Sequence, residues 1–305
     1  MPEEEPTLNN TLISIIIPTF NDWERLSLCL YALDDQTLEK SRYEIIIVNN
    51  DENHFVPDRI RQLTGKHIKI LHEPMPGSYA ARNAGLKVAN GNIIGFTDSD
   101  CVPDPKWLEN ASKYFENVDV DRLAGKVELF FGHNNKRNAA ELYEIAFSFD
   151  QERNVKKFHA SITANFFTRR KYFDEVGLFD ATKKSGEDFG WNRRAHAHDL
   201  TLSYGPEVVV RHPARGSIQE LIRKRKRVFG GKKSRFDFKS VKGFFKEVRY
   251  PAVVFYMYLY IPIRRLSKVN LRLTEKWKVL LLIFYLYLVA QFEHIRLLFG
   301  GNPKR

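Results

Sequence analysis

The sequence predicts an α/β domain with a mostly parallel sheet, followed by a helical appendage. Short runs rich in β-branched residues, at 12–17, 43–48 and 92–97, each end in a polar stretch, and segments with helical spacing lie between them. This alternation, in units of about 30 residues, is typical of parallel strands joined by helices. The 305 residues, 43% of them hydrophobic, suffice for one large domain and an appendage.

The first half of the chain contains most of the expected sheet. LISIII, ended by Pro18, has the composition of a buried strand, and Asn21 or Asp22 can cap the leucine-rich helix that follows. The later elements expected here are strands at Tyr43–Val48, His67–Leu71 and 92–97 and a helix at Tyr79–Ala89.

The second half is less regular. The elements expected there are strands at 123–131, 160–168 and Leu202–Arg211 and helices at 138–150 and Glu187–His196. The last strand ends in VVVRH, after which the composition changes. We therefore expect a domain at 1–215 and a basic, aromatic-rich helical region at 216–305.

Polar residues follow three of the expected strands, at Thr19–Asp22, Asn49–Asn53 and Asp98–Asp100. In parallel α/β sheets, ligands bind beyond the carboxyl ends of the strands. These three segments therefore form one candidate site.

The motif FTDSDCVPD places Asp98 and Asp100 at positions i and i+2, on the same side of an extended chain. Two carboxylates held this close repel unless a cation lies between them. The alternative is a solvated turn that caps a helix at Pro103–Trp107. Because the sequence lacks a GxGxxG or GxxxxGKS/T phosphate loop, a phosphate ligand would require a metal, and these carboxylates suit Mg²⁺ or Mn²⁺.

The positive charge is concentrated at the start of the appendage. Between Arg211 and Arg249, fourteen lysines and arginines face three acids, and this excess equals the net charge of +11. Ser217 and Glu220 have capping-box spacing ahead of IRKRKRVF. The block indicates an anionic partner. It lacks the aromatic interleaving of RNA-binding modules, so anionic lipid is favoured and no nucleic acid is expected.

Two uncharged, aromatic-rich runs follow at Pro251–Ile263 and Val279–Phe292. Both are shorter than the roughly 18–20 apolar residues that cross a bilayer. We therefore expect helices that lie on the membrane surface or enter it partly. The alternative is that they are core helices of a small appendage.

The compartment is predicted from features outside the domain core. The acidic start MPEEEPTLNN has no apolar signal segment, and Cys29 and Cys101 form neither a disulfide framework nor a metal-binding spacing. With the basic tail, these features predict a cytoplasmic protein with peripheral or monotopic association with the inner face of the cell membrane.

Four collinear stretches resemble the family 2 glycosyltransferases, which have the GT-A fold. They are SIIIPTFNDWERLSLCLYAL with YEIIIVNND, GSYAARNAGLKVANGNIIGFTDSDCVPDPKWL, GLFDATKKSGEDFGWNRR and VVVRHPAR, and they cover roughly residues 12–215. The resemblance implies a metal-dependent, inverting transfer of a sugar from a nucleotide-diphosphate sugar. UDP is the expected nucleotide, and a hydroxyl of a glycan or lipid-linked molecule is the expected acceptor.

The resemblance also implies which residues bind the donor. These are Pro18, Thr19, Asn21, Asn49, Arg82, Asp98 and Asn165. Asn49 stands where the family has an acidic residue that contacts the base. An amide can still hydrogen-bond a uracil edge, but the departure leaves the base preference open.

The metal ligands implied by the resemblance are Asp100, as the main ligand, and Asp98, which would face the ribose or the metal. His212 would be a third metal or phosphate ligand, or else a structural histidine.

On the acceptor side, Asp188 in the SGED motif matches the catalytic base of the family, with Glu187 beside it. An acceptor hydroxyl must lose its proton as it attacks the anomeric carbon, so a carboxylate must lie within reach. The alternative is that both acids only stabilise the start of a helix. Trp191, one turn later, would stack on an acceptor sugar or pack in the core.

Two other functions are compatible with parts of the sequence. A nucleotidyltransferase also combines an α/β sheet with metal-binding carboxylates, but it should carry a glycine-rich phosphate loop where this chain has PTFNDW. A catalytically silent binding or scaffold protein could keep the fold. The intact DSD, ED and ARN elements argue against this second alternative.

Overall fold

The computed structural model of the chain describes residues 12–63, 65, 67–132, 137–230, 252–253 and 255–298. The chain divides into two compact units. The first comprises Met1–Glu128, Phe149–Lys183 and Glu187–His212, and the second comprises Leu129–Ser148, Lys184–Gly186 and Pro213–Arg305. The second unit therefore includes a segment, Leu129–Ser148, that a boundary after residue 215 assigns to the first domain.

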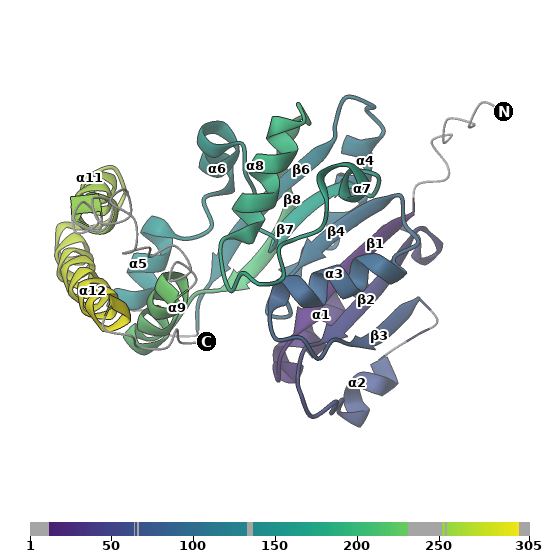
Figure 1. Cartoon of the computed structure of the whole chain (residues 1–305), viewed down its shortest axis with the longest axis horizontal. Coiled ribbons are helices and arrows are strands. Elements are labelled where there is room, and N and C mark those ends of the chain that lie inside the picture. The colour runs from purple at the N-terminus through teal and green to yellow at the C-terminus, as the bar shows by residue number, and fades with distance from the viewer. Residues whose placement is uncertain are drawn as a thin grey trace. The chain divides into compact units, whose positions relative to one another are not determined.

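An eight-stranded sheet forms the centre of the first unit (Figure 1). The strand order is β3-β2-β1-β4-β7-β6-β8-β5. The strands are β1 (Ile13–Thr19), β2 (Tyr43–Asn49), β3 (Ile68–His72), β4 (Ile93–Thr97), β5 (Val102–Pro103), β6 (Arg122–Phe130), β7 (Asn165–Arg169) and β8 (Leu202–Pro213). Strands β3, β2, β1 and β4 are parallel, whereas β7 is antiparallel to both β4 and β6, and β5 is antiparallel to β8. The predicted α/β class is confirmed, and the parallel part of the sheet is the half that the sequence describes best.

Helices cover both faces of this sheet (Figure 1). The helical elements of the first unit are α1 (Trp23–Asp34), η2 (Lys40–Arg42), α2 (Asp58–Leu63), α3 (Ser78–Val88), α4 (Trp107–Phe115), α6 (Gln151–Phe158), α7 (Tyr172–Val176) and α8 (Glu187–Ala197). Helices α1 and α4 pack on one face with Ile13, Ile15 and Ile17, whereas α3, α7 and α8 pack on the other face with Ile16. Because β1 is covered on both sides, its sequence is a continuous apolar run.

Two glycines allow close approach to β1. A Cβ atom at Gly85, in α3, would lie 2.6 Å from Cγ2 of Ile16, and one at Gly95, in β4, would lie 2.6 Å from Cδ1 of Ile15 and from Phe167. No side chain fits at these distances without a shift of its neighbours, so both positions require glycine. They bring α3 and the end of β4 close to β1.

The expected strand at 160–168 is wrong over residues 160–164, which form a loop, and β7 begins at Asn165. The side chain of Gln151 explains the difference. Its amide donates to Oγ of Ser161 at 2.9 Å, and its oxygen accepts from the backbone of Ile162 at 3.0 Å. A buried side chain thus makes hydrogen bonds that a neighbouring strand would otherwise make.

The second unit is helical in its described part. Its elements are α5 (Ala139–Phe147), α9 (Ile218–Gly230), the π-helical segment η4 (Tyr256–Tyr260), α11 (Ile261–Leu266) and α12 (Leu273–Leu298). The predicted capping box is confirmed, since the backbone of Glu220 donates to Oγ of Ser217 and the backbone of Ser217 donates to the Glu220 carboxylate. A small core joins α5, α11 and α12. The rest of the predicted basic block, 231–249, lies outside the described residues.

Helix α12 extends the predicted run at 279–292 in both directions. By length and composition, Leu273–Leu297 could cross a membrane, with a mean hydropathy of 1.5 and 39% of its most apolar window buried in the protein. The expectation that this segment is too short to span a bilayer therefore does not hold for the folded helix. The other predicted run, 251–263, is only partly described and forms the start of a helix, η4 and part of α11.

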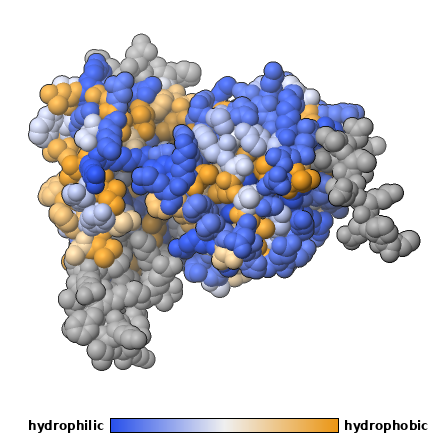
Figure 2. Space-filling view, turned by 90° about the horizontal axis from the view of Figure 1, so that it is seen from above, coloured by the Kyte–Doolittle hydropathy of each residue, from blue (hydrophilic) through white to orange (hydrophobic). Residues whose placement is uncertain are grey.

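Large apolar side chains lie exposed along α12. Figure 2 shows hydrophobic surface (orange) interspersed with hydrophilic residues (blue) in the same unit. The exposed residues include Trp277, Leu281, Phe284, Leu288, Phe292 and Ile295. They recur every three or four positions, so they occupy one face of the helix. The described appendage thus combines a basic helix, α9, with an apolar stripe on α12.

Candidate functional site

The candidate site lies where the strand order reverses, between β1 and β4. Such a switch point opens a crevice beyond the carboxyl ends of the strands. Side chains and backbone connect the loops there: the backbone of Asn50 donates to the Thr19 carbonyl at 2.9 Å, and Oγ of Ser99 donates to Oδ2 of Asp22 at 3.1 Å. The three polar strand ends predicted to meet are therefore brought together.

The loop after β1 supplies polar atoms to this crevice. Oγ1 of Thr19 is buried and has no hydrogen-bond partner among the described residues. Asn21 adopts a left-handed backbone conformation with a φ of 53°, which asparagine tolerates better than most residues. Pro18 precedes them as a half-buried residue of β1. The predicted donor residues of this loop thus lie at the switch point.

The loop after β2 is shaped by its own asparagines. The amide of Asn49 donates to the Phe55 carbonyl at 3.1 Å, and its oxygen accepts from the backbone of Asp51 at 3.1 Å. Asn50 accepts from the backbone of Gly77 at 2.7 Å and so fixes the start of α3. Asn49 therefore holds the conformation of this loop. Its side chain is engaged in these hydrogen bonds, so its influence on a bound base is exerted through the shape of the loop.

Arg82 and Asp98 form a close ion pair, with Nη2 of Arg82 and Oδ1 of Asp98 2.6 Å apart. The arginine side chain is 3% exposed, whereas the aspartate side chain is 35% exposed. Arg82 is therefore a buried residue of α3 that holds one acid of the DSD motif, and it does not lie on the exposed face of the helix.

Asp100 lies between a histidine and an arginine. Its carboxylate is 3.4 Å from Nε2 of His212 and 3.5 Å from Nη1 of Arg25. Burial raises the pKa of Asp100, and the nearby Asp98 and Asp22 carboxylates raise it further, whereas His212 and Arg25 oppose the increase. The net increase shows that the described surroundings of Asp100 favour its negative charge less than water does.

No group of three or more histidine, cysteine, aspartate or glutamate side chains is close enough to hold a metal ion within the described ranges. The donor chemistry nevertheless fits a divalent ion. Asp100 and His212 are in contact and offer an oxygen and a nitrogen, and Asp98 is close enough to raise the pKa of Asp100. Mg²⁺ and Mn²⁺ commonly fill their remaining positions with water and phosphate oxygens.

Asp188 lies in the first turn of α8, and its side chain is hydrogen-bonded to α3. Its Oδ1 accepts from the hydroxyl of Tyr79 at 3.3 Å and from the backbone of Phe189 at 3.0 Å. Burial raises the pKa of Asp188; these hydrogen bonds and Arg82 oppose the increase, and Asp98 adds to it. The net increase makes the carboxylate a stronger base than an exposed aspartate.

The neighbouring Glu187 is buried, and its Oε1 accepts from Arg194 at 2.7 Å and from the backbone of Asp180 at 3.1 Å. This pairing makes Glu187 a positioning residue that fixes the start of α8, not a group that transfers a proton.

Two predicted ligand-binding residues lie in the core instead. The Asn165 amide donates to the carbonyls of Lys126 and Val208, and its oxygen accepts from Nε1 of Trp107, which satisfies the side chain internally. Trp191 is 0% exposed and packs against Phe173, with ring centroids 4.8 Å apart. Asn165 therefore has no free group for a sugar, and Trp191 presents no ring face to an acceptor.

Other site residues were given no individual role in binding or catalysis from the sequence. Tyr79 directly precedes the AARN motif, Asp22 and Arg25 belong to NDWER, and Ser99 is the central residue of DSD. Their proximity to recognised motifs is the available signal. Tyrosine and serine at such positions are, however, equally compatible with core packing or a turn.

The chain has a mixed α/β sheet, acidic residues at the switch point of this sheet and an acid at the start of a nearby helix. Together these features define it as a glycosyltransferase of the GT-A fold. Comparison with known proteins supports this class. The sequence model described as Glycosyl transferase family 2 matches residues 14–177, and the chain belongs to this family. Glycosyltransferase AglE of Haloferax volcanii is 33% identical over 222 residues, which cover 72% of each chain. A Methanococcus voltae protein named dolichyl N-acetyl-alpha-D-glucosaminyl phosphate 3-beta-D-2,3-diacetamido-2,3-dideoxy-beta-D-glucuronosyltransferase is 25% identical over 224 residues, 69% of this chain and 70% of that protein.

Solved structures share the fold. The mannosyltransferase PcManGT from Pyrobaculum calidifontis, solved with GDP-Man and Mn²⁺, superposes with a TM-score of 0.61 at 17% identity, covering 97% of this chain and 90% of that one. Residues 1–349 of S. aureus TarS, solved with UDP-GlcNAc, superpose with a TM-score of 0.52 at 17% identity, covering 93% of this chain and 92% of that one. At this identity the likeness establishes the fold.

Proposed function

We propose that this glycosyltransferase moves a sugar from a nucleotide-diphosphate sugar to an acceptor hydroxyl, with inversion at the anomeric carbon. The observation that carries the proposal is the placement of two side chains on α3: Arg82 binds Asp98, and Tyr79, one turn earlier, binds Asp188. One helix thereby connects the acidic pair at the end of β4 with the acid at the start of α8. A donor at Asp98 and an acceptor at Asp188 would meet beside this helix.

The donor is proposed to lie in the crevice between β1 and β4. Thr19 offers a buried hydroxyl without a partner among the described residues, and Asn21 and Pro18 lie in the same segment. The related fold in TarS was solved with UDP-GlcNAc and that in PcManGT with GDP-Man, so both nucleotides are reasonable donors to test. We favour UDP.

Asp188 is proposed as the catalytic base. Its carboxylate takes the proton of the acceptor hydroxyl as the acceptor oxygen bonds to the anomeric carbon. The bond from that carbon to the diphosphate oxygen breaks at the same time, and the nucleotide diphosphate leaves with the electron pair. Because displacement is direct, the anomeric configuration inverts. The raised pKa of Asp188 favours proton abstraction near neutral pH.

Asp100 and His212, with Asp98, would hold Mg²⁺ or Mn²⁺, which when bound would neutralise charge on the departing diphosphate. Arg25 contacts Asp100 and Asp22, so it lies on the same side and would contribute further positive charge.

The acceptor is proposed to be a glycan or a lipid-linked molecule at the cytosolic face of the membrane, where the second unit would associate with anionic lipid. The basic α9 and the apolar stripe on α12 support this location. The name of the Methanococcus voltae relative describes transfer to a dolichyl-phosphate-linked sugar, which is compatible with such an acceptor. Neither feature calls for nucleic acid.

A nucleotide-sugar screen tests the reaction. Purified protein is incubated with Mn²⁺ and a panel of UDP- and GDP-sugars, and release of the nucleotide diphosphate is measured with a broad acceptor panel. We expect release from a UDP-sugar. Donor binding without turnover across the whole panel would instead favour the catalytically silent alternative.

The base is tested with Asp188→Asn, which should lower kcat about 10²–10⁴-fold, because an amide cannot accept the proton. UDP affinity should stay within about twofold, since the substitution is nearly isosteric. Asp174→Asn, at an exposed position of α7, is the matched control. Full activity of Asp188→Asn would show that another group is the base.

A further inference from the structure

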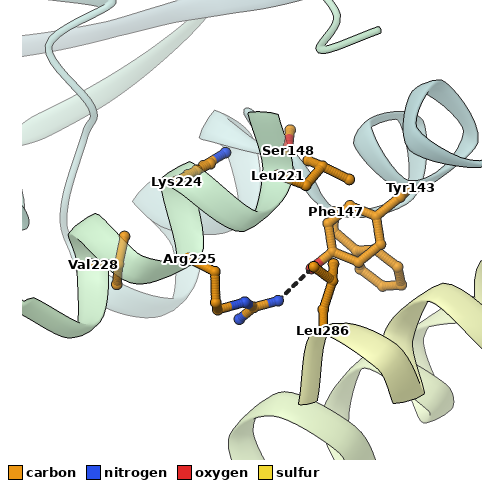
Figure 3. Close-up of a pocket in the computed structure, with 8 residues that line it drawn as sticks. All are labelled: Tyr143, Phe147, Ser148, Leu221, Lys224, Arg225, Val228 and Leu286. Carbon is orange, nitrogen blue, oxygen red and sulfur yellow. Dashed lines mark hydrogen bonds between the residues drawn. The ribbon is translucent and has the colours of Figure 1, made fainter. Parts of the chain in front are cut away.

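The second unit contains a pocket of about 180 Å³ between α5, α9 and α12. Figure 3 shows the side chains that line it. They are Tyr143, Phe147, Ser148, Leu221, Lys224, Arg225, Val228 and Leu286. The site described above uses none of them.

One face of α9 explains the chemistry of this pocket. Leu221, Lys224, Arg225 and Val228 occupy positions i, i+3, i+4 and i+7, which lie on the same side of a helix. Apolar and basic side chains therefore lie together along one surface of α9. This pattern presents hydrocarbon and positive charge to the same cavity.

The apolar part of the lining is well defined. The rings of Tyr143 and Phe147 pack with centroids 4.8 Å apart, and Leu221 and Leu286 belong to one buried cluster. Leu286 is a buried residue of α12, the helix that carries the exposed apolar stripe. Hydrocarbon placed in the pocket would therefore contact two aromatic rings and two leucines.

The polar part is rich in cations. The carboxylate of Glu144, with no exposed surface, pairs with Arg215 at 2.7 Å and is shared with Lys224 at 3.7 Å. Arg225 donates to the hydroxyl of Tyr143 at 2.9 Å, as Figure 3 shows. Lys224 and Arg225 thus place two basic side chains in the lining of a pocket whose other lining residues carry no charge. An anion entering the pocket would be attracted by both side chains.

We propose that this pocket binds the phosphate group of a lipid phosphomonoester, with Lys224 and Arg225 contacting the phosphate and the first methylene groups packing on Tyr143, Phe147 and Leu286. A phosphomonoester carries about −1.5 to −2 charges at neutral pH, which matches two cations. The apolar stripe on α12 indicates that the ligand comes from a membrane. The binding test uses no nucleotide sugar. Its outcome is therefore independent of the donor and of the catalytic base proposed for the transfer reaction.

The basicity of Lys224 is consistent with this site. Burial and Arg215 lower the pKa of Lys224, Glu144 opposes the decrease, and the net pKa is about 8. A bound phosphate would favour the charged ammonium group.

The test measures binding of dodecyl phosphate, below its micelle concentration, to the full chain in a neutral detergent by calorimetry. Lys224→Gln and Arg225→Gln should each weaken binding about tenfold or more, because each removes a charge-assisted hydrogen bond. Arg223→Gln removes the same charge from an exposed position of α9 outside the pocket and should change affinity by less than about twofold. An equal loss in Arg223→Gln would overturn the proposal in favour of a general charge effect.

Two further arms identify the ligand class. Inorganic phosphate should bind at least about tenfold more weakly than dodecyl phosphate, because it lacks the methylene contacts. Dodecanol should not compete. Equal affinity for inorganic phosphate, or displacement by dodecanol, would contradict a lipid phosphate site.

A steric variant keeps the test independent of the charge variants. Val228→Trp fills the pocket without altering net charge and should abolish dodecyl phosphate binding while the circular dichroism melt stays close to wild type. Unchanged binding by a folded Val228→Trp protein would show that the ligand lies elsewhere.

Discussion

The two units each contain a partly buried cluster of charged side chains, and the clusters differ in character. At the end of β4, Asp98 and Asp100 share their surroundings with Asp22, and burial together with neighbouring acids raises the pKa of Asp100. In the second unit, burial alone would raise the pKa of Glu144, but Lys224 and Arg215 lower it overall. The first cluster brings three acids together, and the second places two basic side chains, Lys224 and Arg225, in the lining of one pocket.

The difference indicates which ligand suits each cluster. Charges in a partly buried setting are stabilised by opposite charges. A cation suits the first cluster, as proposed for a site that handles a diphosphate with a divalent ion. An anion suits the second cluster, as proposed for a pocket that receives a phosphate.

The largest effect is expected at the acidic cluster. Asp100→Asn should lower kcat/KM about 10³-fold and remove the dependence on added Mn²⁺, because it removes charge that would hold a metal against the diphosphate. Asp104→Asn, four positions later and outside the site, is the matched control. The measurement is nucleotide release over a Mn²⁺ titration. An Asp100→Asn enzyme that keeps its Mn²⁺ dependence would remove the basis for calling this cluster a cation site.

The basic cluster is tested through the carboxylate of Glu144. Glu144→Gln should lower the free energy of unfolding by about 3 kcal/mol, because Arg215 and Lys224 lose their shared partner in a buried setting. Amide hydrogen exchange in α5 measures the loss. An unchanged exchange rate would show that these cations are compensated elsewhere.

The pH dependence of this variant sharpens the same point. Because the folded-state pKa of Glu144 is lowered, its stabilisation is complete above the unfolded pKa of about 4.3 and is lost as the pH falls through the folded pKa. The stability difference between wild type and Glu144→Gln should therefore shrink in acid. A difference independent of pH would point to packing as its cause.

The smallest effect is expected at Tyr79. Its hydroxyl lowers the pKa of Asp188, so Tyr79→Phe should raise that pKa and move the acid limb of the kcat profile to higher pH. Since the base acts deprotonated, activity measured on the acid limb should fall about threefold. Tyr31→Phe, at an exposed position of α1, is the control. An unmoved acid limb would argue that Tyr79 is only a packing residue.

The parallel half of the sheet was predictable because its strands are buried on both faces and so appear as apolar runs. The convergence of Asp98, Asp100 and Asp22 followed from the positions of the strand ends alone. The loop at 160–164 was not predictable, because its composition suits a strand and only the side chain of Gln151 holds it otherwise.

The wrong assignment of two site residues has a different cause. Asn165 and Trp191 matched a motif by position. Asn165 is buried by its contacts with α4, β6 and β8, and Trp191 by its contacts with β7 and α7, and the sequence displays neither set of contacts. The length of helix α12 was underestimated because Lys278 and Glu293 lie at the two ends of its uncharged run. The helix continues past both residues, and Glu293 is neutralised by Arg296 at 2.5 Å.

Gly85 and Gly95 carry a practical consequence for engineering. Because they leave no space beside Ile15 and Ile16, they set how closely α3 and β4 approach β1, and hence where Arg82 and Asp98 stand. A mutant library intended to change donor choice should therefore leave both glycines intact. The diversity is better placed at exposed positions of the two adjoining loops, Phe20 and residues 52–55, which lie outside the acidic cluster.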